Sequence, residues 1–315
     1  MKLSSVRSCT NILRLGTAAR SCILQGGRGR VLASFSRVVY LLTESGELFW
    51  ITTEDAPMHR RCIQISAPLP GLPTALPFHM QDHHLAFDYS VILDMEKAPV
   101  WSAPYLDPTI VIDLTGLFSR IQFLFSHLDH SQAGGFGVFI PHILSLSRGM
   151  DADALPEPAD PILHFARPLI LNMARACLQG RSSLIAQSAG GLIGLGSGLT
   201  PSGDDFLGGL SFTMASLQIA YPDLFQTADI LPIETYRSQT HLISYTLLKD
   251  LAGGHAVAPL HSLMLRFLGG GALDDILPAV NQLTGIGHST GWDLLTGMLA
   301  GFLLTAPGIH LIPSR

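Results

Sequence analysis

Two short stretches of the sequence combine glycines, hydroxyl side chains and aspartates in an order that could bind an anion. The first is GLGSGLTPSGDDFLGGL, residues 194–210, in which three alternate glycines precede two aspartates. Glycine permits backbone conformations and close approaches to a ligand that other residues do not. A glycine-rich loop that runs into a helix offers unpaired N–H groups at the positive end of the helix dipole. The stretch lacks the lysine of a P-loop, so it predicts a different kind of anion loop.

The same arrangement recurs in GIGHSTGWDLLTGML, residues 285–299. When the two stretches are aligned, Asp205 and Asp293 fall at the same position, each two residues after a glycine. The residues three and four positions after each aspartate are small, which allows two helices to approach closely. We therefore expect helices beginning near Ser202 and Thr290 to pack together, with both aspartates at one cleft.

The candidate site residues fall into two groups. Asp205, Asp293 and His288 are the candidates for catalysis, because carboxylates and imidazole donate and accept protons. Thr240 and Ser244 stand four apart on one helical face, so their hydroxyls could point into the same pocket. The other candidates for binding substrate or an anion are the glycines, hydroxyls and acid of the two helix starts: Gly196, Gly198, Thr200, Ser202, Gly203, Asp204, Ser289, Thr290 and Gly291.

A purely structural interpretation exists for each of these residues. Aspartates commonly cap helices, glycines allow packing, and helical Thr or Ser hydroxyls commonly bond to the preceding carbonyls. The duplication favours a shared pocket. In such a pocket the carboxylates could accept substrate N–H groups, coordinate Mg²⁺ or relay a proton, and the sequence leaves these roles open. Apart from Mg²⁺, no cofactor is expected.

The elements that would position these residues indicate an α+β protein. Short β-rich runs broken by Gly and Pro occupy the first part of the chain, and long apolar segments with helical spacing follow. We expect a β-rich domain, barrel or sandwich-like, over residues 1–110 and a helical domain over residues 111–315. The helical segments expected around the candidate site are 183–193, 204–220, 236–251, 272–283 and 291–305.

Composition and charge narrow the function classes. Of the 315 residues, 47% are hydrophobic and 14% charged, which excludes a disordered chain or a coiled coil. The longest apolar run, Leu294–Ala306, is too short for the roughly 20 residues that cross a bilayer. The four cysteines form no CxxC pair and no secretion signal is present, so we expect a cytoplasmic protein with no membrane partner.

Residues 1–43 are basic, with seven Lys or Arg and no acid. A transit peptide or a nucleic-acid contact would fit, but the strand-like continuation favours arginines on a solvated sheet face, and no nucleic-acid partner is expected. Arg28, Arg30 and Arg37 are candidates for a phosphate clamp. The histidine-rich groups at 82–84 and 127–130 lack metal-binding spacing, so no dedicated metal site is expected.

Taken with Thr240-x-x-x-Ser244 and Ala252-Gly253-Gly254, the two stretches resemble a bacterial domain-of-unknown-function family, loosely called carboxylases, that includes the small subunit of oxamate carbamoyltransferase. The resemblance covers roughly residues 15–310. It implies phosphorolysis of oxalurate to oxamate and carbamoyl phosphate, in allantoin and purine nitrogen breakdown. It also implies a multi-subunit complex with other subunits, one of them similar to succinyl-CoA synthetases. Ser197 and Thr290 depart from the family pattern, where Pro and Ser are expected.

Two other functions compete with this carbamoyltransferase subunit. A non-catalytic subunit that binds an anionic metabolite or serves as a scaffold would explain the lack of an evident nucleophile. A carboxylase would need biotin, ATP or a metal, and the sequence has neither a biotinyl-type Met-Lys-Met nor a lysine-containing Gly-rich ATP loop. The carboxylase is therefore the weakest of the three.

Overall fold

The chain folds into two compact units, Met1–Ala103 and Pro104–Arg315. The computed structural model describes residues 8–9, 12–66, 71–87, 91–151, 158–225 and 231–308. Strands predominate in the first unit and helices in the second. The α+β class predicted from the sequence is confirmed.

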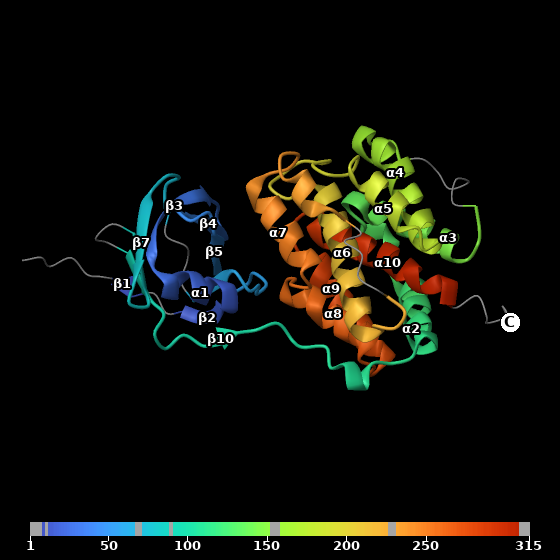
Figure 1. The fold of residues 1–315 in the computed structure, drawn as a ribbon, viewed down its shortest axis with the longest axis horizontal. Helices are drawn as coiled ribbons and strands as arrows, with labels where there is room; N and C mark the ends of the chain where they lie inside the picture. Colours follow the sequence, from blue (N-terminus) through green and yellow to red (C-terminus); the bar gives the residue numbers. More distant parts are fainter. Residues whose placement is uncertain are drawn as a thin grey trace, which may run out of the picture. The chain divides into compact units, whose positions relative to one another are not determined.

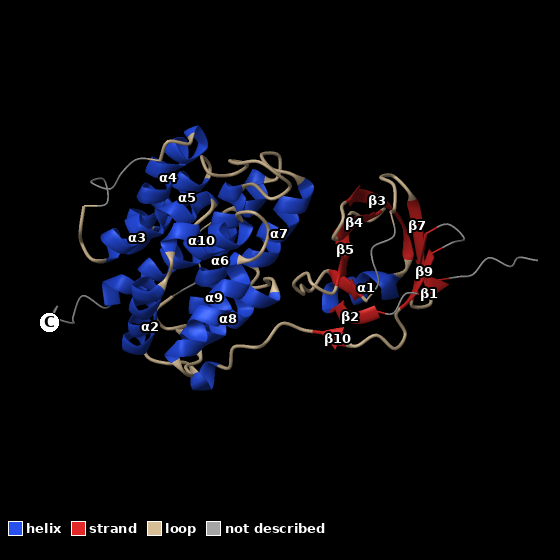
Figure 2. Cartoon of the chain, turned by 180° about the vertical axis from the view of Figure 1, so that it is seen from behind, coloured by secondary structure: helices blue, strands red, loops and turns tan. Residues whose placement is uncertain are grey.

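The N-terminal unit is a single mixed sheet, ten-stranded among the described residues, in the order β1-β9-β8-β7-β3-β4-β5-β6-β2-β10. Neighbouring strands are antiparallel except in the pairs β1–β9, β5–β6 and β2–β10. Figure 2 shows the sheet curled into a half-barrel around helix α1. The strands are β1 (Ser8–Cys9), β2 (Ile12–Gly16), β3 (Gly27–Ser34), β4 (Val38–Thr43), β5 (Leu48–Thr53), β6 (Cys62–Ile65), β7 (Pro77–Gln81), β8 (His84–Phe87), β9 (Val91–Asp94) and β10 (Val100–Trp101).

Helix α1 (Thr17–Gln25) was not expected inside a β-rich run. Its buried side chains, Ala19, Cys22 and Ile23, join the same core as the inward residues of the strands. The helix therefore fills the concave side of the curled sheet. A nine-residue helix is too short to show a clear apolar period in the sequence, which is why the pattern predicted only strands.

The C-terminal unit packs its helices around α6 and α10, which lie in the middle of the group in Figure 1. Both begin where the sequence predicted, at Ser202 and Thr290. The α-helices are α2 (Leu114–His127), α3 (Ile140–Ser147), α4 (Pro161–Leu178), α5 (Ser182–Ala189), α6 (Ser202–Ala220), α7 (Leu242–Ala252), α8 (Ala258–Leu268), α9 (Ile276–Thr284) and α10 (Thr290–Phe302). Short 3₁₀ helices are η1 (Pro108–Ile110), η2 (His130–Gln132), η3 (Gly135–Phe139), η5 (Ile233–Tyr236), η6 (Leu273–Asp275) and η7 (Leu303–Gly308).

Glycines allow α6 and α10 to cross almost backbone to backbone. A Cβ atom on Gly209 would lie 2.1 Å from the carbonyl oxygen of Leu294 on α10. In the reciprocal contact, a Cβ on Gly297 would lie 1.9 Å from the carbonyl oxygen of Phe206 on α6. Neither distance leaves room for any side chain. The prediction that the small residues after each aspartate serve close helix packing is confirmed.

None of the described helices is long and apolar enough to cross a bilayer. Three cysteines, Cys22, Cys62 and Cys177, are free thiols inside the folded cores.

Candidate functional site

The two glycine-aspartate stretches meet at the paired starts of α6 and α10. The Thr200 and Thr290 hydroxyl oxygens are 3.4 Å apart, and those of Ser202 and Ser289 are 3.5 Å apart. Hydroxyls from the two loops are thus within hydrogen-bond reach of one another although about ninety positions separate them in sequence. The structure brings the two predicted helix starts together at one place.

Asp205 lies beneath this hydroxyl layer. Its side chain is 6% exposed, and its Oδ2 has no hydrogen-bond partner among the described residues. Burial raises the pKa of Asp205 well above its usual value, and the nearby charge of Asp293 raises it further. Hydrogen bonding from the Thr290 and Thr200 hydroxyls opposes this rise only in part. The surroundings of Asp205 therefore favour its protonated form.

Asp293 is the matching group of α10 and is fully buried. Its Oδ1 accepts a 2.6 Å hydrogen bond from the backbone N–H of Phe136, while its Oδ2 has no partner among the described residues. Burial raises the pKa of Asp293 to about 6, against the lowering effect of the Phe136 N–H and the Ser202 and Ser289 hydroxyls. Asp293 is therefore mostly ionised at pH 7.

Each of the two buried aspartates has hydroxyl neighbours from both loops. Asp205 is paired with Thr290, the first residue of α10, and Asp293 with Ser202, the first residue of α6. Each aspartate also faces a hydroxyl of the loop before its own helix. All four hydroxyl residues are partly exposed, and His288 lies at the exposed rim beside them. The site is layered: an exposed rim, a hydroxyl layer, and two buried carboxyl groups.

Asp204 and the two α7-side hydroxyls form a separate structural cluster. Asp204 Oδ1 accepts the N–H of Gly194 at 2.7 Å, and its Oδ2 accepts hydroxyls from both Thr240 and Ser244, the latter at 2.5 Å. The three residues predicted to bind an anion are thus bonded to one another. The cluster ties the glycine-rich loop to α7.

We expect Asp204→Asn to lower the free energy of unfolding by about 2–4 kcal/mol, since the amide cannot accept bonds on both sides of a buried network. Urea unfolding of the full chain measures the loss. Asp223→Asn, on an exposed turn just after α6, is the matched control and should change stability by less than about 0.5 kcal/mol. Equal stability of the two variants would contradict the proposed tie between loop and helix.

The free N–H groups of the first site are in the loop rather than in the first helical turn. The N–H of Gly203 bonds to the carbonyl of Leu195, and those of Asp204 and Asp205 bond to the carbonyl of Pro201. The expectation that first-turn amides point outward is wrong for these three residues, because the loop folds back to satisfy them. In the two loops, the amides of residues 196–200 and 202 and those of residues 287–290 have no backbone hydrogen-bond partner among the described residues.

Neither helix start has a side-chain cap. The residue before α6 is Pro201, and neither Thr200 nor Ser202 caps the helix. The residue before α10, Ser289, makes no capping bond either. The reason is that these hydroxyls face the buried aspartates and each other. Polar side chains that could stabilise their own helices are turned toward a shared centre.

The predicted glycines serve different purposes. A Cβ on Gly203 would lie 1.8 Å from the carbonyl oxygen of Leu192, and one on Gly291 would lie 1.9 Å from that of Leu283. These two glycines are required for packing, and the same close fit in both copies matches the duplicated pattern. Gly196 and Gly198 have φ of +123° and +96°, and a Cβ on Gly198 would meet nothing within 4 Å. Gly198 is therefore open to a ligand.

A third segment of the site was missed by the sequence analysis. The turn at residues 133–137, AGGFG, leads into η3 and supplies the Phe136 N–H to Asp293. Gly135 has φ of +52°, and a Cβ there would lie 2.4 Å from Asp293 Oδ1. Gly134 approaches the carbonyl of His288 in the same way, at 3.2 Å. The glycine cluster itself was the signal, but it occurs once and has no copy to align with.

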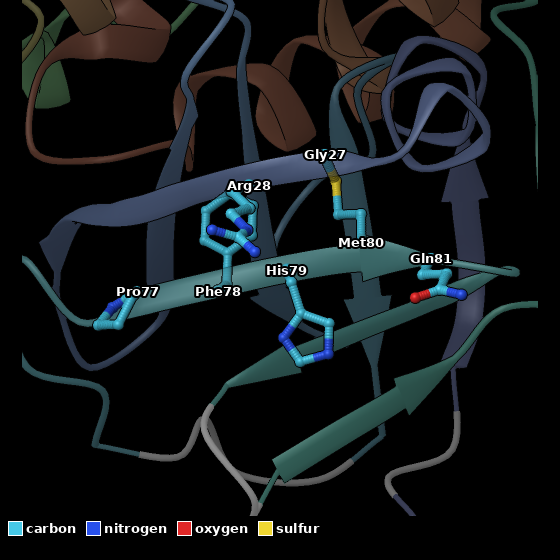
Figure 3. Close-up of a pocket in the computed structure, with 7 residues that line it drawn as sticks. All are labelled: Gly27, Arg28, Pro77, Phe78, His79, Met80 and Gln81. Atoms are coloured by element: carbon cyan, nitrogen blue, oxygen red, sulfur yellow. The ribbon is translucent and has the colours of Figure 1, made fainter.

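The arginines proposed as a phosphate clamp lie on the N-terminal sheet. Arg28 lines a surface hollow of about 620 Å³ on β3 and β7, where it pairs in register with His79 (Figure 3). Arg30 follows on the same strand, and Arg37 forms an ion pair with Asp55. Lys2 and Arg7, also in the basic segment, lie outside the described residues.

The described side chains form no cluster of metal ligands. No group of three or more His, Cys, Asp or Glu side chains in the described ranges could hold a metal ion. The Asp82 and His84 region instead forms local contacts, His84 Nδ1 with the Asp82 carbonyl at 2.6 Å and His84 Nε2 with Asp94 at 3.9 Å. A magnesium role for Asp205 and Asp293 therefore has no third protein ligand of these types.

Burial of Asp293 predicts a pH-dependent stability. The pKa of Asp293 is about 6 in the folded protein and 3.8 when the carboxyl group is free in water. The contribution of the protonated Asp293 side chain to stability is therefore present below pH 3.8 and is lost as the pH rises through about 6. This loss amounts to about 3 kcal/mol. We expect Asp293→Asn to gain this amount relative to the wild type between pH 4 and pH 7, measured by urea unfolding. Parallel pH profiles for the two proteins would contradict it.

Comparison with known proteins found one similarity. Neither the curated proteins nor the solved structures gave a match. The model of the family described as oxamate carbamoyltransferase subunit AllH matches residues 192–302, which include both glycine-aspartate stretches and the α6–α10 pair. The part of the chain that forms the site is therefore similar to oxamate carbamoyltransferase subunits of this family.

Proposed function

We propose that this chain takes part in the phosphorolysis of oxalurate to oxamate and carbamoyl phosphate, through the site between α6 and α10. The observation that carries the proposal is the pair of buried carboxyl groups, Asp205 and Asp293, beneath hydroxyls from both loops. The similarity of residues 192–302 to the AllH family supports a role in oxamate carbamoyltransferase. The partners are the other subunits of that complex, one similar to succinyl-CoA synthetases.

The reaction requires one proton to move. An oxygen of hydrogenphosphate attacks the ureido carbonyl carbon of oxalurate, and a C–O bond forms as the C–N bond to the oxamate nitrogen breaks. The electron pair of that bond goes to the nitrogen, which must gain a proton. Hydrogenphosphate loses the proton that it carried. The site therefore needs one group that accepts a proton and another that donates one.

The two carboxyl groups are suited to these opposite roles. Burial favours the protonated form of Asp205, which can donate a proton toward the leaving nitrogen, while ionised Asp293 can accept the proton of phosphate. Both lie below the surface, so protons pass through the hydroxyls of Thr290 and Ser202, which touch the substrates. The proton then returns from Asp293 to its neighbour Asp205, which restores the starting state.

Two anions must also be bound. Backbone N–H groups of residues 196–200 and 287–290 have no backbone hydrogen-bond partner among the described residues, and Gly198 leaves space beside them. Such amides stabilise the charge of phosphate and of the oxalurate carboxylate without an added cation. His288 at the rim is placed to donate a further bond to an anion.

The test is carbamoyl phosphate formation from oxalurate and inorganic phosphate by the reconstituted complex. Omission of this chain should abolish the product, and the double change Ser202→Ala with Thr290→Ala should reduce the rate at least about 100-fold. Thr246→Ala is the matched control, because that hydroxyl only bonds to the carbonyl of Leu242 on its own helix. If the double variant supports the wild-type rate, the chain is a scaffold and its partners perform the chemistry.

A further inference from the structure

The turn at residues 133–137 contacts both the second loop and Asp293. The Phe136 N–H bonds to Asp293 Oδ1 at 2.6 Å inside the protein. The hydrogen-bonding neighbours of Asp205 within the described part of the chain are the hydroxyls of Thr290 and Thr200, and no backbone N–H there donates to it. A hydroxyl can donate to a carboxylate or accept from a carboxylic acid, whereas a backbone N–H can only donate.

This difference breaks the symmetry of the two carboxyl groups. Because the Phe136 N–H occupies Oδ1, any proton on Asp293 must sit on Oδ2, the oxygen with no partner. A fixed donor favours the ionised form of Asp293. Asp205 has no such donor and can satisfy its neighbours in either form. The pair therefore places its shared proton on Asp205.

We propose that the turn at 133–137 is a third arm of the site, in which the Phe136 N–H makes Asp293 the proton acceptor and leaves Asp205 as the donor. The inference rests on the proposed function and names Phe136 and Gly135 as positioning residues of the same site. Gly135 is required for this hydrogen bond, because a Cβ at that position would displace Asp293 Oδ1 from the Phe136 N–H.

The elements packed against α10 carry further ionisable groups: Asp204 and Asp205 on α6, His142 on α3, and His164, Arg167 and Arg175 on α4. The charges of Asp293 and Asp204 both raise the pKa of Asp205. The Phe136 N–H donates to Asp293 and so distinguishes the two carboxyl groups.

The test is an infrared titration of the full chain, in which Asp293→Asn identifies the band of the protonated Asp293 carboxyl. We expect a midpoint of about 6 in the wild type. In Gly135→Ala the midpoint should rise by about one pH unit, because the N–H bond is lost. Gly149→Ala is the matched control: it has φ of +69° and nothing within 4 Å of an added Cβ, so it carries the same backbone strain away from the site.

A midpoint in Gly135→Ala equal to that of the wild type, or an equal rise in Gly149→Ala, would overturn the proposal. If Gly135→Ala does not fold, Gly134→Ala provides the milder change, with an added Cβ 3.2 Å from the carbonyl of His288. It should raise the midpoint in the same direction by a smaller amount, and an unchanged midpoint overturns the proposal.

In the reconstituted complex, Gly135→Ala should lower kcat about tenfold while KM for phosphate stays within about twofold, because a proton transfer rather than binding is impaired. The infrared result does not depend on activity. Failure of the proposed function, seen as a wild-type complex that makes no carbamoyl phosphate, is therefore distinguishable from failure of this inference, seen as an unmoved midpoint.

Discussion

Asp205→Asn and Asp293→Asn are each expected to reduce carbamoyl phosphate formation by the reconstituted complex by about 100- to 10,000-fold, the range of lost proton transfer. Asn has nearly the size of Asp but neither gives up nor takes a proton under these conditions. The effect should appear in kcat more than in KM, because the two carboxyl groups lie below the hydroxyls that we propose bind the substrates. Steady-state assays at pH 7 measure it.

The same variants must keep their fold for this result to mean lost chemistry. Burial disfavours the charged form of Asp205, so the uncharged Asn in its place should leave the thermal midpoint unchanged or raise it. Full activity in both variants would return the aspartates to a role in helix packing alone. Loss of activity in Asp204→Asn would be less informative, because that residue ties the loop to α7.

The second large effect concerns the crossing of α6 and α10. Gly297→Ala should lower the free energy of unfolding by more than about 3 kcal/mol, because its Cβ would lie 1.9 Å from the backbone oxygen of Phe206 and the helices would have to separate. This exceeds the gain of about 1 kcal/mol from placing Ala instead of Gly in a helix. Urea unfolding measures the net change.

Gly208→Ala is the matched control, on the face of α6 that packs against α7. The nearest atom to its Cβ would be the Cδ1 tip of Leu251, at 2.4 Å, and a leucine side chain can change its rotamer where a backbone carbonyl cannot. We expect a loss below about 1 kcal/mol. Comparable losses in both variants would mean that the crossing is no tighter than ordinary helix packing.

The sequence predicted the centre of the site because the pattern occurs twice. The repeated order of hydroxyl, glycine and aspartate located the starts of α6 and α10, and the small residues after the aspartates indicated their close packing. The assignment of Asp205 and Asp293 to catalysis stays a prediction. A single copy of the pattern would not have distinguished these residues from ordinary helix caps.

The parts that escaped prediction depend on long-range contacts. Asp204 bonds to Thr240 and Ser244 at the start of α7. Nothing in the local sequence says which of the two adjacent acids faces α7 and which faces α10. The Phe136 N–H reaches Asp293 across 157 positions of the chain. Gly203 and Gly291 were assigned to ligand binding, but a glycine needed for packing looks the same in sequence as one open to a ligand.

The reciprocal pairing of α6 and α10 also constrains the order in which the protein folds during synthesis. Until α10 leaves the ribosome, the glycine face of α6 lacks the helix that covers it, so this half cannot complete itself. Docking of α10 buries Asp205 and Asp293 together, and burial raises the pKa of both. The pairing of the two helices is therefore favoured by mild acidity.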